Sequence, residues 1–180
     1  MGGCVDSMVK IAFLFPGQGS QYVGMGKNFY ESSADSRALF ESAGKVLGKD
    51  LAALCINGPE DDLKLTENAQ PAILTHSIIA LKRLRENGIE SVMVAGHSLG
   101  EYSALVAAGS IRFLDAVRLV QLRGRFMQEA VPVGVGTMAA IIGLPLETIQ
   151  NLCLQCSTDG NIVKPANMNI PEQTDIAGHR

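Results

Sequence analysis

Apolar and polar positions alternate along this chain in two ways, which together predict strands interleaved with helices. Short apolar runs cover residues 10–15 and 91–95, and each is followed by a proline or a glycine, as is typical of a buried strand. Longer segments repeat apolar residues every three or four positions, as one buried face of a helix requires. These helical segments are residues 36–47, 50–55, 69–87, 99–108 and 113–130.

The pattern changes at Gly134-Val135-Gly136, which ends the helical part of the chain. The residues that follow predict a strand, a helix and two more strands: 137–142, 147–156, 161–164 and 173–177. Strands that alternate with helices indicate a layered α/β architecture. Asp175 stands out in the last strand, because an apolar residue would be expected at its position.

Composition makes this an ordinary globular chain. Its 180 residues are 47% hydrophobic and 18% charged, with a net charge of −3. This length allows a well-buried domain, and the absence of a basic cluster argues against nucleic-acid binding. No apolar run reaches the roughly 18 residues of a membrane span, and residues 1–7 do not form a secretion signal. We therefore expect a cytoplasmic protein without a membrane segment, in which residues 1–7 are an extension before Met8.

Four cysteines are present, and two of them form Cys153-x-x-Cys156. A zinc site needs about four ligands, and no second pair of Cys or His residues lies nearby. Because this pair falls in a predicted helix, packing is the simpler interpretation, and no metal site is expected.

The strand at residues 91–95 leads directly into Gly96-His97-Ser98-Leu99-Gly100. A Gly-x-Ser-x-Gly turn between a strand and a helix holds the serine at a strained backbone position with its hydroxyl exposed. The following helix turns its free N–H groups toward that hydroxyl, so the N–H of Leu99 is a natural oxyanion donor. The same residues also suit a glycine-lined tight turn with a surface serine. Ser98 is thus the candidate nucleophile.

Three longer motifs give this turn a more specific context. They are FPGQGSQ at residues 15–21, GHSLGEYSA at 96–104 and RGRFMQ at 123–128. In this order they resemble the malonyl-CoA:acyl carrier protein transacylases of fatty-acid synthesis. The resemblance runs from about residue 10 to residue 179 and includes NAQPA at 68–72, TMAAIIG at 137–143 and PANMN at 165–169.

The resemblance implies a fold with two domains. An α/β-hydrolase-like large domain with a parallel sheet would occupy residues 8–130. A small ferredoxin-like insert would begin at residue 131 and occupy residues 131–180. Both domains have further elements in the family, so both look truncated in this chain.

The resemblance also implies a reaction in two steps. Ser98 would take a malonyl group from coenzyme A as an ester and then yield it to the phosphopantetheine thiol of acyl carrier protein, in a ping-pong mechanism. Malonyl-CoA would be the substrate and acyl carrier protein the partner. No permanently bound cofactor is implied.

Other site residues follow from the same family positions. Gln18 would join Leu99 in the oxyanion hole through its backbone N–H, and the glycines beside it would allow that loop to approach a ligand closely. The resemblance further implies that the substrate pocket is lined by His97, Gln70 and Met127.

Arg123 would hold the free carboxylate of the malonyl group. A guanidinium suits this role because it can bind a carboxylate through two parallel hydrogen bonds. The sequence pattern alone does not separate Arg123 from Arg118 and Arg125, which belong to the same predicted helix.

A serine nucleophile needs a general base, and the chain contains three histidines. His97 directly precedes Ser98 and should point in another direction. His76 lies within a predicted helix, where packing is the simpler role, and His179 matches a family position other than the base. In the family the base follows the segment matched here, so we expect this chain to transfer acyl groups poorly.

Two other functions stay open at this point. The chain could be a serine hydrolase or esterase, although Arg123, the Gln18 loop and the order of the histidines argue against it. It could also be a non-catalytic fragment that binds an acyl group. Three basic residues on one predicted helix could bind an acidic carrier protein: Lys82, Arg83 and Arg85. A helix face exposed to solvent is the simpler interpretation of these residues.

Overall fold

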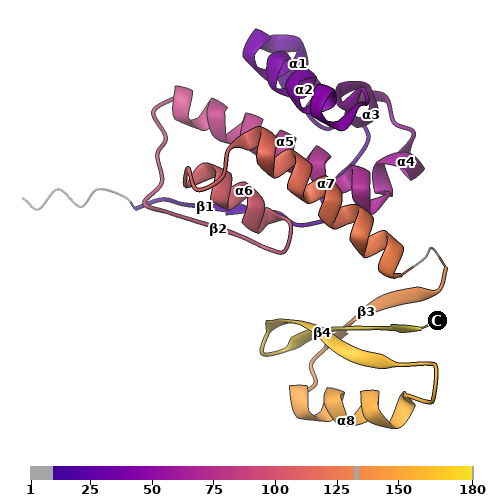
Figure 1. Cartoon of the computed structure of the whole chain (residues 1–180). Coiled ribbons are helices and arrows are strands. Elements are labelled where there is room, and N and C mark those ends of the chain that lie inside the picture. Colours follow the sequence, from indigo (N-terminus) through magenta and orange to yellow (C-terminus); the bar gives the residue numbers. More distant parts are fainter. Residues whose placement is uncertain (1–9, 132–133, 180) are drawn as a thin grey trace, which may run out of the picture. The chain divides into compact units, whose positions relative to one another are not determined.

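The computed structural model describes residues 10–131 and 134–179 (Figure 1). The chain divides into two compact units, Met1–Met127 and Gln128–Arg180. The predicted α/β class is confirmed, because the first unit contains a parallel sheet among helices and the second combines a helix with three strands. The predicted extension at residues 1–7 lies outside the described residues.

The sheet of the first unit consists of β1 (Ala12–Phe15) and β2 (Met93–Gly96). The two strands are parallel, and Phe15 pairs with Gly96 at their carboxyl ends. The turn that contains Ser98 and the loop that contains Gln18 therefore leave the sheet at the same edge.

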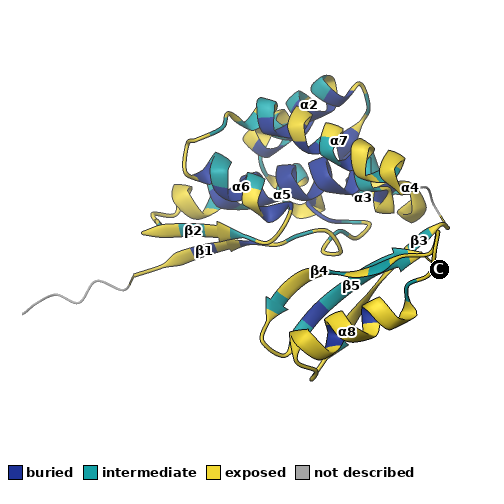
Figure 2. Ribbon diagram, turned by 60° about the horizontal axis from the view of Figure 1, so that its bottom comes forward, coloured by how far each residue is buried: buried dark blue, intermediate teal, exposed yellow. Residues whose placement is uncertain are grey.

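One face of this sheet is open to solvent. Phe13 and Phe15 are buried against the helices, whereas Leu14 between them is 78% exposed and Met93 is 63% exposed. Among the described residues no third strand pairs with β1 or β2. The prediction of a fully buried strand at residues 10–15 is therefore wrong for one face, because the helices cover only the other (Figure 2).

Most helices predicted from the sequence are present in the first unit, but several begin or end at other residues than predicted. Residues 113–130 form a helix as predicted, and two other helices begin at side-chain caps, where Ser33 accepts from the N–H of Ser36 and Asp50 from that of Ala53. Two short helices, α1 and α4, were not predicted. The set is α1 (Lys27–Ser32), α2 (Ala34–Leu47), α3 (Leu51–Asn57), α4 (Glu60–Lys64), α5 (Thr66–Glu86), α6 (Gly100–Ala107) and α7 (Phe113–Ala130).

Helix α5 is the most deeply buried helix of the chain (Figure 2). It begins at Thr66 and not at the predicted residue 69, because the carbonyl of Leu65 already accepts hydrogen bonds from the amides of Asn68 and Ala69. Pro71 consequently lies inside the helix. The core around α5 contains fully buried side chains from five helices and from the turn before α6: Phe40, Leu51, Leu63, Ile73, Leu74, Ile79, Leu99, Val117 and Val120.

The second unit is an antiparallel sheet with one helix. Its elements are β3 (Gly136–Ile142), α8 (Leu146–Cys156), β4 (Val163–Ile170) and β5 (Gln173–His179), and the strand order is β3-β5-β4. Helix α8 packs on one face of the sheet through buried Ile149 and Cys153, whereas Cys156 is exposed. The packing interpretation therefore holds for only one cysteine of the pair. The described residues contain no group of three or more His, Cys, Asp or Glu that could hold a metal ion.

Strand β4 is longer than the predicted residues 161–164, and Asp175 of β5 lies opposite Asn167 in its extension. Oδ2 of Asp175 accepts hydrogen bonds from the side-chain amides of Asn167 at 3.3 Å and Asn169 at 2.9 Å, both on β4. A half-buried carboxylate with two amide donors is stable in a sheet, because its hydrogen bonds replace those lost with water. A polar pairing between neighbouring strands thus replaces the expected apolar residue.

His76 is held by packing, as its place within a helix predicted. Its ring lies against that of Phe29, with centroids 5.6 Å apart. Burial lowers the pKa of His76 from its usual value of 6.5, because the charged imidazolium loses hydration inside the unit.

We expect acid to destabilise the first unit through His76. Because the folded pKa of this ring is lowered, the unfolded chain binds the extra proton first as pH falls through about 6.5. The stability that the neutral ring contributes is complete above this pH and is lost below it. Thermal unfolding followed by circular dichroism between about pH 8 and pH 5 should show a smaller loss of stability in His76→Gln than in the unmodified chain. Equal losses in the two proteins would contradict this assignment.

Candidate active site

Ser98 lies in the turn between β2 and α6 at a φ of 52°, and it is the only non-glycine residue with positive φ in the described part of the chain. A left-handed backbone is unfavourable for a residue with a Cβ and is retained where the surrounding structure enforces it. The side chain of Ser98 is exposed. The strained turn with an outward hydroxyl that the Gly-x-Ser-x-Gly pattern predicts is therefore present.

The two glycines of the pattern are required by close backbone approaches. A Cβ built on Gly96 would lie 2.0 Å from the carbonyl carbon of Gly100. A Cβ on Gly100 would lie 2.2 Å from the carbonyl oxygen of Phe15, at the end of β1. Neither position can accept a side chain without moving backbone, so the pair fixes the turn tightly against the sheet.

The helical turn after Ser98 begins within the motif itself. The amide of Gly100 donates to the carbonyl of His97 at 2.8 Å, and the amide of Glu101 donates to that of Ser98 at 3.2 Å. Leu99 is fully buried, which anchors the start of α6 in the core. The amide of Leu99 thus belongs to the amino-terminal turn that carries the positive end of the helix dipole.

The loop with Gln18 packs directly against this turn. A Cβ on Gly17 would lie 2.9 Å from the carbonyl oxygen of His97, so only a glycine permits the contact. Within the loop, the hydroxyl of Ser20 donates to the carbonyl of Gly17 at 2.9 Å. The side chain of Gln18 donates from Nε2 to Oγ1 of Thr66 at 3.2 Å, which ties the loop to the start of α5.

Arg123 joins Ser98 to the buried interior. Its Nη2 donates to Oγ of Ser98 at 3.0 Å, and its Nη1 donates to Oε1 of Gln70 at 2.8 Å. Gln70 is fully buried, and its Nε2 contacts Sδ of Met127 at 3.4 Å. The guanidinium also lies over the ring of Tyr102, with its Cζ 5.9 Å from the ring centroid. The structure therefore brings together four of the predicted site residues: Ser98, Arg123, Gln70 and Met127.

This geometry separates Arg123 from its neighbours on α7. Arg118 and Arg125 are exposed, whereas Arg123 is half-buried and directed at Ser98. The next residue, Gly124, is buried, and a Cβ on it would lie 2.6 Å from the carbonyl oxygen of Thr66. The close approach of α7 to α5 at this glycine is what brings Arg123 within reach of Gln70.

The three histidines occupy different settings. His76 packs against Phe29, as described above. His179 belongs to the second unit, where its Nδ1 accepts from the amide of Ile162 at 3.1 Å. His97 is exposed beside Ser98, and its Nδ1 lies 3.1 Å from the Cβ position of Gly17.

Tyr102 was not assigned a role from the sequence. It lies four residues after Ser98, in the first turn of α6, whereas Ser98 lies in the turn that precedes the helix. The available signal is its place in the GHSLGEYSA motif, at the start of the helix that follows Ser98.

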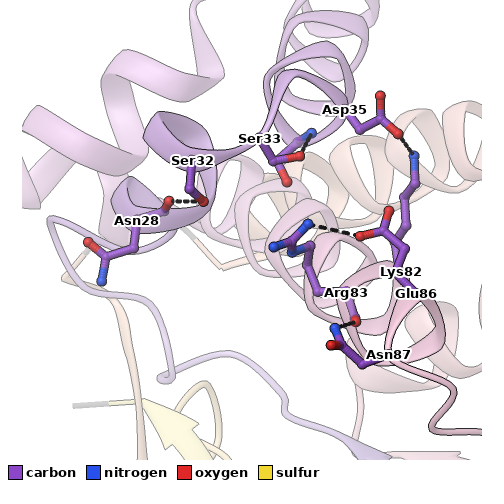
Figure 3. Close-up of polar contacts among 9 residues, drawn as sticks. Asn28, Ser32, Ser33, Asp35, Lys82, Arg83, Glu86 and Asn87 are labelled. Carbon is purple, nitrogen blue, oxygen red and sulfur yellow. Dashed lines mark hydrogen bonds and ion pairs between the residues drawn. The ribbon is translucent and has the colours of Figure 1, made fainter.

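The basic residues near the end of α5 are engaged with other groups: Arg85 donates to the carbonyl of Ala107 at 3.0 Å, and Figure 3 shows the ion pairs of Lys82 and Arg83. Lys82 binds Asp35 on α2 at 2.5 Å, and Arg83 binds Glu86 at 2.9 Å. The hydrogen bond and charge of Lys82 lower the pKa of Asp35. The positive charges at this end of α5 are thus balanced by neighbouring negative charges. This balance favours an ordinary solvent-exposed helix face over a docking surface for an acidic protein.

A cavity of about 550 Å³ lies in the second unit, beneath α8. Its lining is mainly apolar and includes Ile141, Ile149, Cys153, Ile162 and Ile176. None of the predicted site residues lines it. Separately, none of the helices in the described ranges combines the length and apolar character needed to cross a membrane.

Known proteins similar to this chain are acyl transferases. The relatives include malonyl CoA-acyl carrier protein transacylases from Bacillus subtilis strain 168, 52% identical over 171 residues, and from Escherichia coli strain K12, 51% identical over 175 residues. The first match covers 95% of this chain and 54% of the relative, and the second covers 96% and 56%. The chain thus spans about half the length of these relatives.

Solved structures give the same result. A complex described as a type II PKS acyl-carrier protein with its malonyl-transacylase matches with a TM-score of 0.87 and 47% identity, over 96% of this chain and 56% of that chain. The malonyl CoA-acyl carrier protein transacylase of Coxiella burnetii matches with a TM-score of 0.87 and 44% identity, over 94% and 54%. The resemblance predicted from the sequence motifs is confirmed by these matches. Because the family model described as acyl transferase domain matches residues 12–180, this chain belongs to the acyl transferase domain family.

Proposed function

We propose that this chain carries the malonyl-accepting site of an enzyme that moves a malonyl group from coenzyme A to acyl carrier protein. The observation that carries the proposal is the 3.0 Å contact between Nη2 of Arg123 and Oγ of Ser98. A guanidinium beside an exposed serine hydroxyl suits an acyl group that ends in a carboxylate. The names of the relatives, malonyl CoA-acyl carrier protein transacylases, support the same substrate.

In the first step, Oγ of Ser98 attacks the thioester carbonyl of malonyl-CoA. The carbon–sulfur bond breaks, a malonyl ester forms on Ser98, and the proton of the hydroxyl passes through a base to the departing thiol of coenzyme A. The carbonyl oxygen becomes negative during the attack. The backbone N–H groups of Leu99 and Gln18 receive that charge, a role supported by the helix start at Leu99 and by the tight contact of Gly17 with the turn.

Arg123 binds the free carboxylate while Ser98 reacts. In a malonyl group only one methylene separates the carboxylate from the reacting carbonyl. A cation within hydrogen-bond distance of Oγ is therefore close enough to reach the carboxylate as well. Gln70 holds the other side of the guanidinium from a fully buried position, while Met127 and His97 line the site.

In the second step, the phosphopantetheine thiol of acyl carrier protein attacks the ester and releases Ser98. One of the matching solved structures is a complex of an acyl-carrier protein with its malonyl-transacylase, which supports this class of partner. The proposed reaction uses malonyl-CoA as a substrate and requires no permanently bound cofactor.

The fold and location belong to the same proposal. Residues 8–130 correspond to part of an α/β-hydrolase-like large domain, supported by the parallel pair β1–β2. Residues 131–180 correspond to the beginning of a ferredoxin-like insert, supported by the order β3-β5-β4 with α8 on one face. Both domains are then partial in this chain, and the proposed reaction takes place in the cytoplasm.

Neither alternative function gains support from the described residues. A serine hydrolase acting on neutral esters has no use for a cation held against its nucleophile. A purely acyl-binding fragment has no use for a serine at a strained φ of 52°. Both features are accounted for by transfer of a carboxylated acyl group.

We further propose that this chain turns over slowly. His76 packs against Phe29, and Nδ1 of His179 accepts a hydrogen bond from the amide of Ile162, so each ring has a structural contact of its own. His97 adjoins Ser98 in the backbone, and its ring is turned to the Gly17 loop. These contacts support the proposal that no histidine of this chain serves Ser98 as an efficient base.

The first test is the position of the acyl ester. Extended incubation of the 180-residue chain with malonyl-CoA should add one malonyl group, and peptide mapping should locate it on Ser98. Ser98→Ala should remove the adduct, whereas Ser110→Ala, at an exposed serine after α6, should leave it unchanged. A malonyl group found on another residue would refute the assignment of the nucleophile.

The second test is the carboxylate clamp. Replacing Arg123 by Lys keeps the charge but removes the paired N–H donors, so malonyl-CoA should bind roughly tenfold more weakly. Binding of acetyl-CoA, which has no carboxylate, should change little. Isothermal titration calorimetry measures both, and Arg118→Lys on the same helix is the matched control. Equal effects on the two ligands would mean that Arg123 does not recognise the carboxylate.

The third test is the rate. Transfer of malonyl from coenzyme A to acyl carrier protein by this chain should be about 10²- to 10⁴-fold slower than by the Bacillus subtilis relative, the usual contribution of a general base. Added imidazole should accelerate formation of the Ser98 ester, because it supplies the missing base. A rate equal to that of the relative, without imidazole, would disprove the proposed lack of a base.

A further inference from the structure

We propose that Tyr102 is a positioning residue that orients the Arg123 guanidinium for the carboxylate of the acyl substrate. The inference rests on the proposed malonyl transfer and adds a specificity-determining side chain to it. The geometry behind it is a cation over an aromatic face: Cζ of Arg123 lies 5.9 Å from the ring centroid of Tyr102. This is within the roughly 6 Å over which a guanidinium is attracted to an aromatic ring.

The backbone of Tyr102 is fixed by the same turn that exposes Ser98. Its amide donates to the carbonyl of Leu99 at 3.0 Å, in the first turn of α6. The side chain is half-buried, so its ring is packed and also available to a neighbour. Tyr102 and Ser98 are therefore both anchored at the start of α6, with Ser98 just before the helix and Tyr102 in its first turn.

The ring adds an interaction of a different kind from the hydrogen bonds of Arg123. Gln70 and Ser98 accept from Nη1 and Nη2, which lie at the rim of the guanidinium plane. The ring of Tyr102 instead contacts the guanidinium as a cation held over its face. The attraction between the ring and the cation therefore restrains the guanidinium in addition to the two hydrogen bonds.

This support matters when substrate binds. In the proposed reaction the carboxylate replaces Ser98 as a partner of Arg123, so one of the two rim contacts is given up. The contacts with Gln70 and Tyr102 remain, and they keep the guanidinium oriented while Ser98 reacts. A carboxylate needs two parallel donors in one plane, so a tilted guanidinium would bind it less well.

The expected consequence is selective. Weakening the contact between ring and cation should reduce binding of malonyl-CoA by about two- to fivefold. Binding of acetyl-CoA should stay the same, because an acetyl group offers nothing for Arg123 to hold. A ring that merely fills space would affect both ligands together.

The experiment varies the ring electronically while its shape is kept. Tyr102 is replaced in the full chain by Phe, by a monofluorinated phenylalanine and by a trifluorinated phenylalanine, which carry progressively less negative charge on the ring face. Tyr102→Leu removes the face altogether. Isothermal titration calorimetry then gives the Kd of malonyl-CoA and of acetyl-CoA for each variant, and circular dichroism checks that each is folded.

A matched control is available at Tyr30. Its ring contacts the ring of Phe40 edge-on, with centroids 5.9 Å apart, and has no cation over its face among the described contacts. The same fluorinated series at this position should leave the ratio of the two dissociation constants unchanged.

The outcomes separate this inference from the proposed function. A malonyl preference in the unmodified chain that declines stepwise with fluorination and is lowest in Tyr102→Leu supports the role of Tyr102. A malonyl preference that is constant across the series overturns that role and leaves the proposed function intact. An unmodified chain that binds malonyl-CoA no better than acetyl-CoA overturns both.

Discussion

The close approach of Gly100 to the end of β1 is the constraint on which the site depends. A Cβ on Gly100 would lie only 2.2 Å from the carbonyl oxygen of Phe15, so helix α6 begins directly against the sheet. The chain has to turn within a few residues of β2, and Ser98 takes up the left-handed backbone that this turn requires. The same contact determines where the amide of Leu99 lies, because Leu99 is buried at the beginning of the helix. The proposed nucleophile, Ser98, and the proposed oxyanion donor, the amide of Leu99, thus both depend on one packing contact.

A second close approach brings the cation. Helix α7 meets α5 at Gly124, where a Cβ would lie 2.6 Å from the carbonyl oxygen of Thr66. Arg123 precedes this contact and therefore reaches Gln70 on α5 and Ser98 on the turn. Thr66 also accepts the hydrogen bond from Gln18, so α5 supports both the cation and the loop that contains Gln18. The site is assembled on α5, the best-buried helix, which explains how surface residues are held in a defined arrangement.

The sequence predicted what local patterns determine. The Ser98 turn follows from two glycines and the strand before them, and the bounds of the last long helix of the first unit were correct. Contacts between distant segments were not predictable, because no local pattern encodes them. The choice of Arg123 over Arg118 and Arg125 depends on Gln70, 53 positions away. Likewise, the exposed side of β1 depends on which strands pair with it, and the polar role of Asp175 depends on amides from a neighbouring strand.

The described contacts organise binding more completely than activation. A hydroxyl that accepts a hydrogen bond from a guanidinium has less electron density to offer an electrophile, so the contact between Arg123 and Ser98 restrains the nucleophile at rest. In the proposed reaction a malonyl carboxylate competes for this guanidinium and releases Oγ, whereas an acetyl group does not. In this proposal Arg123 both distinguishes malonyl from acetyl groups and releases Oγ of Ser98 when a malonyl group binds. Proton removal from Ser98 is a separate requirement of the proposed reaction.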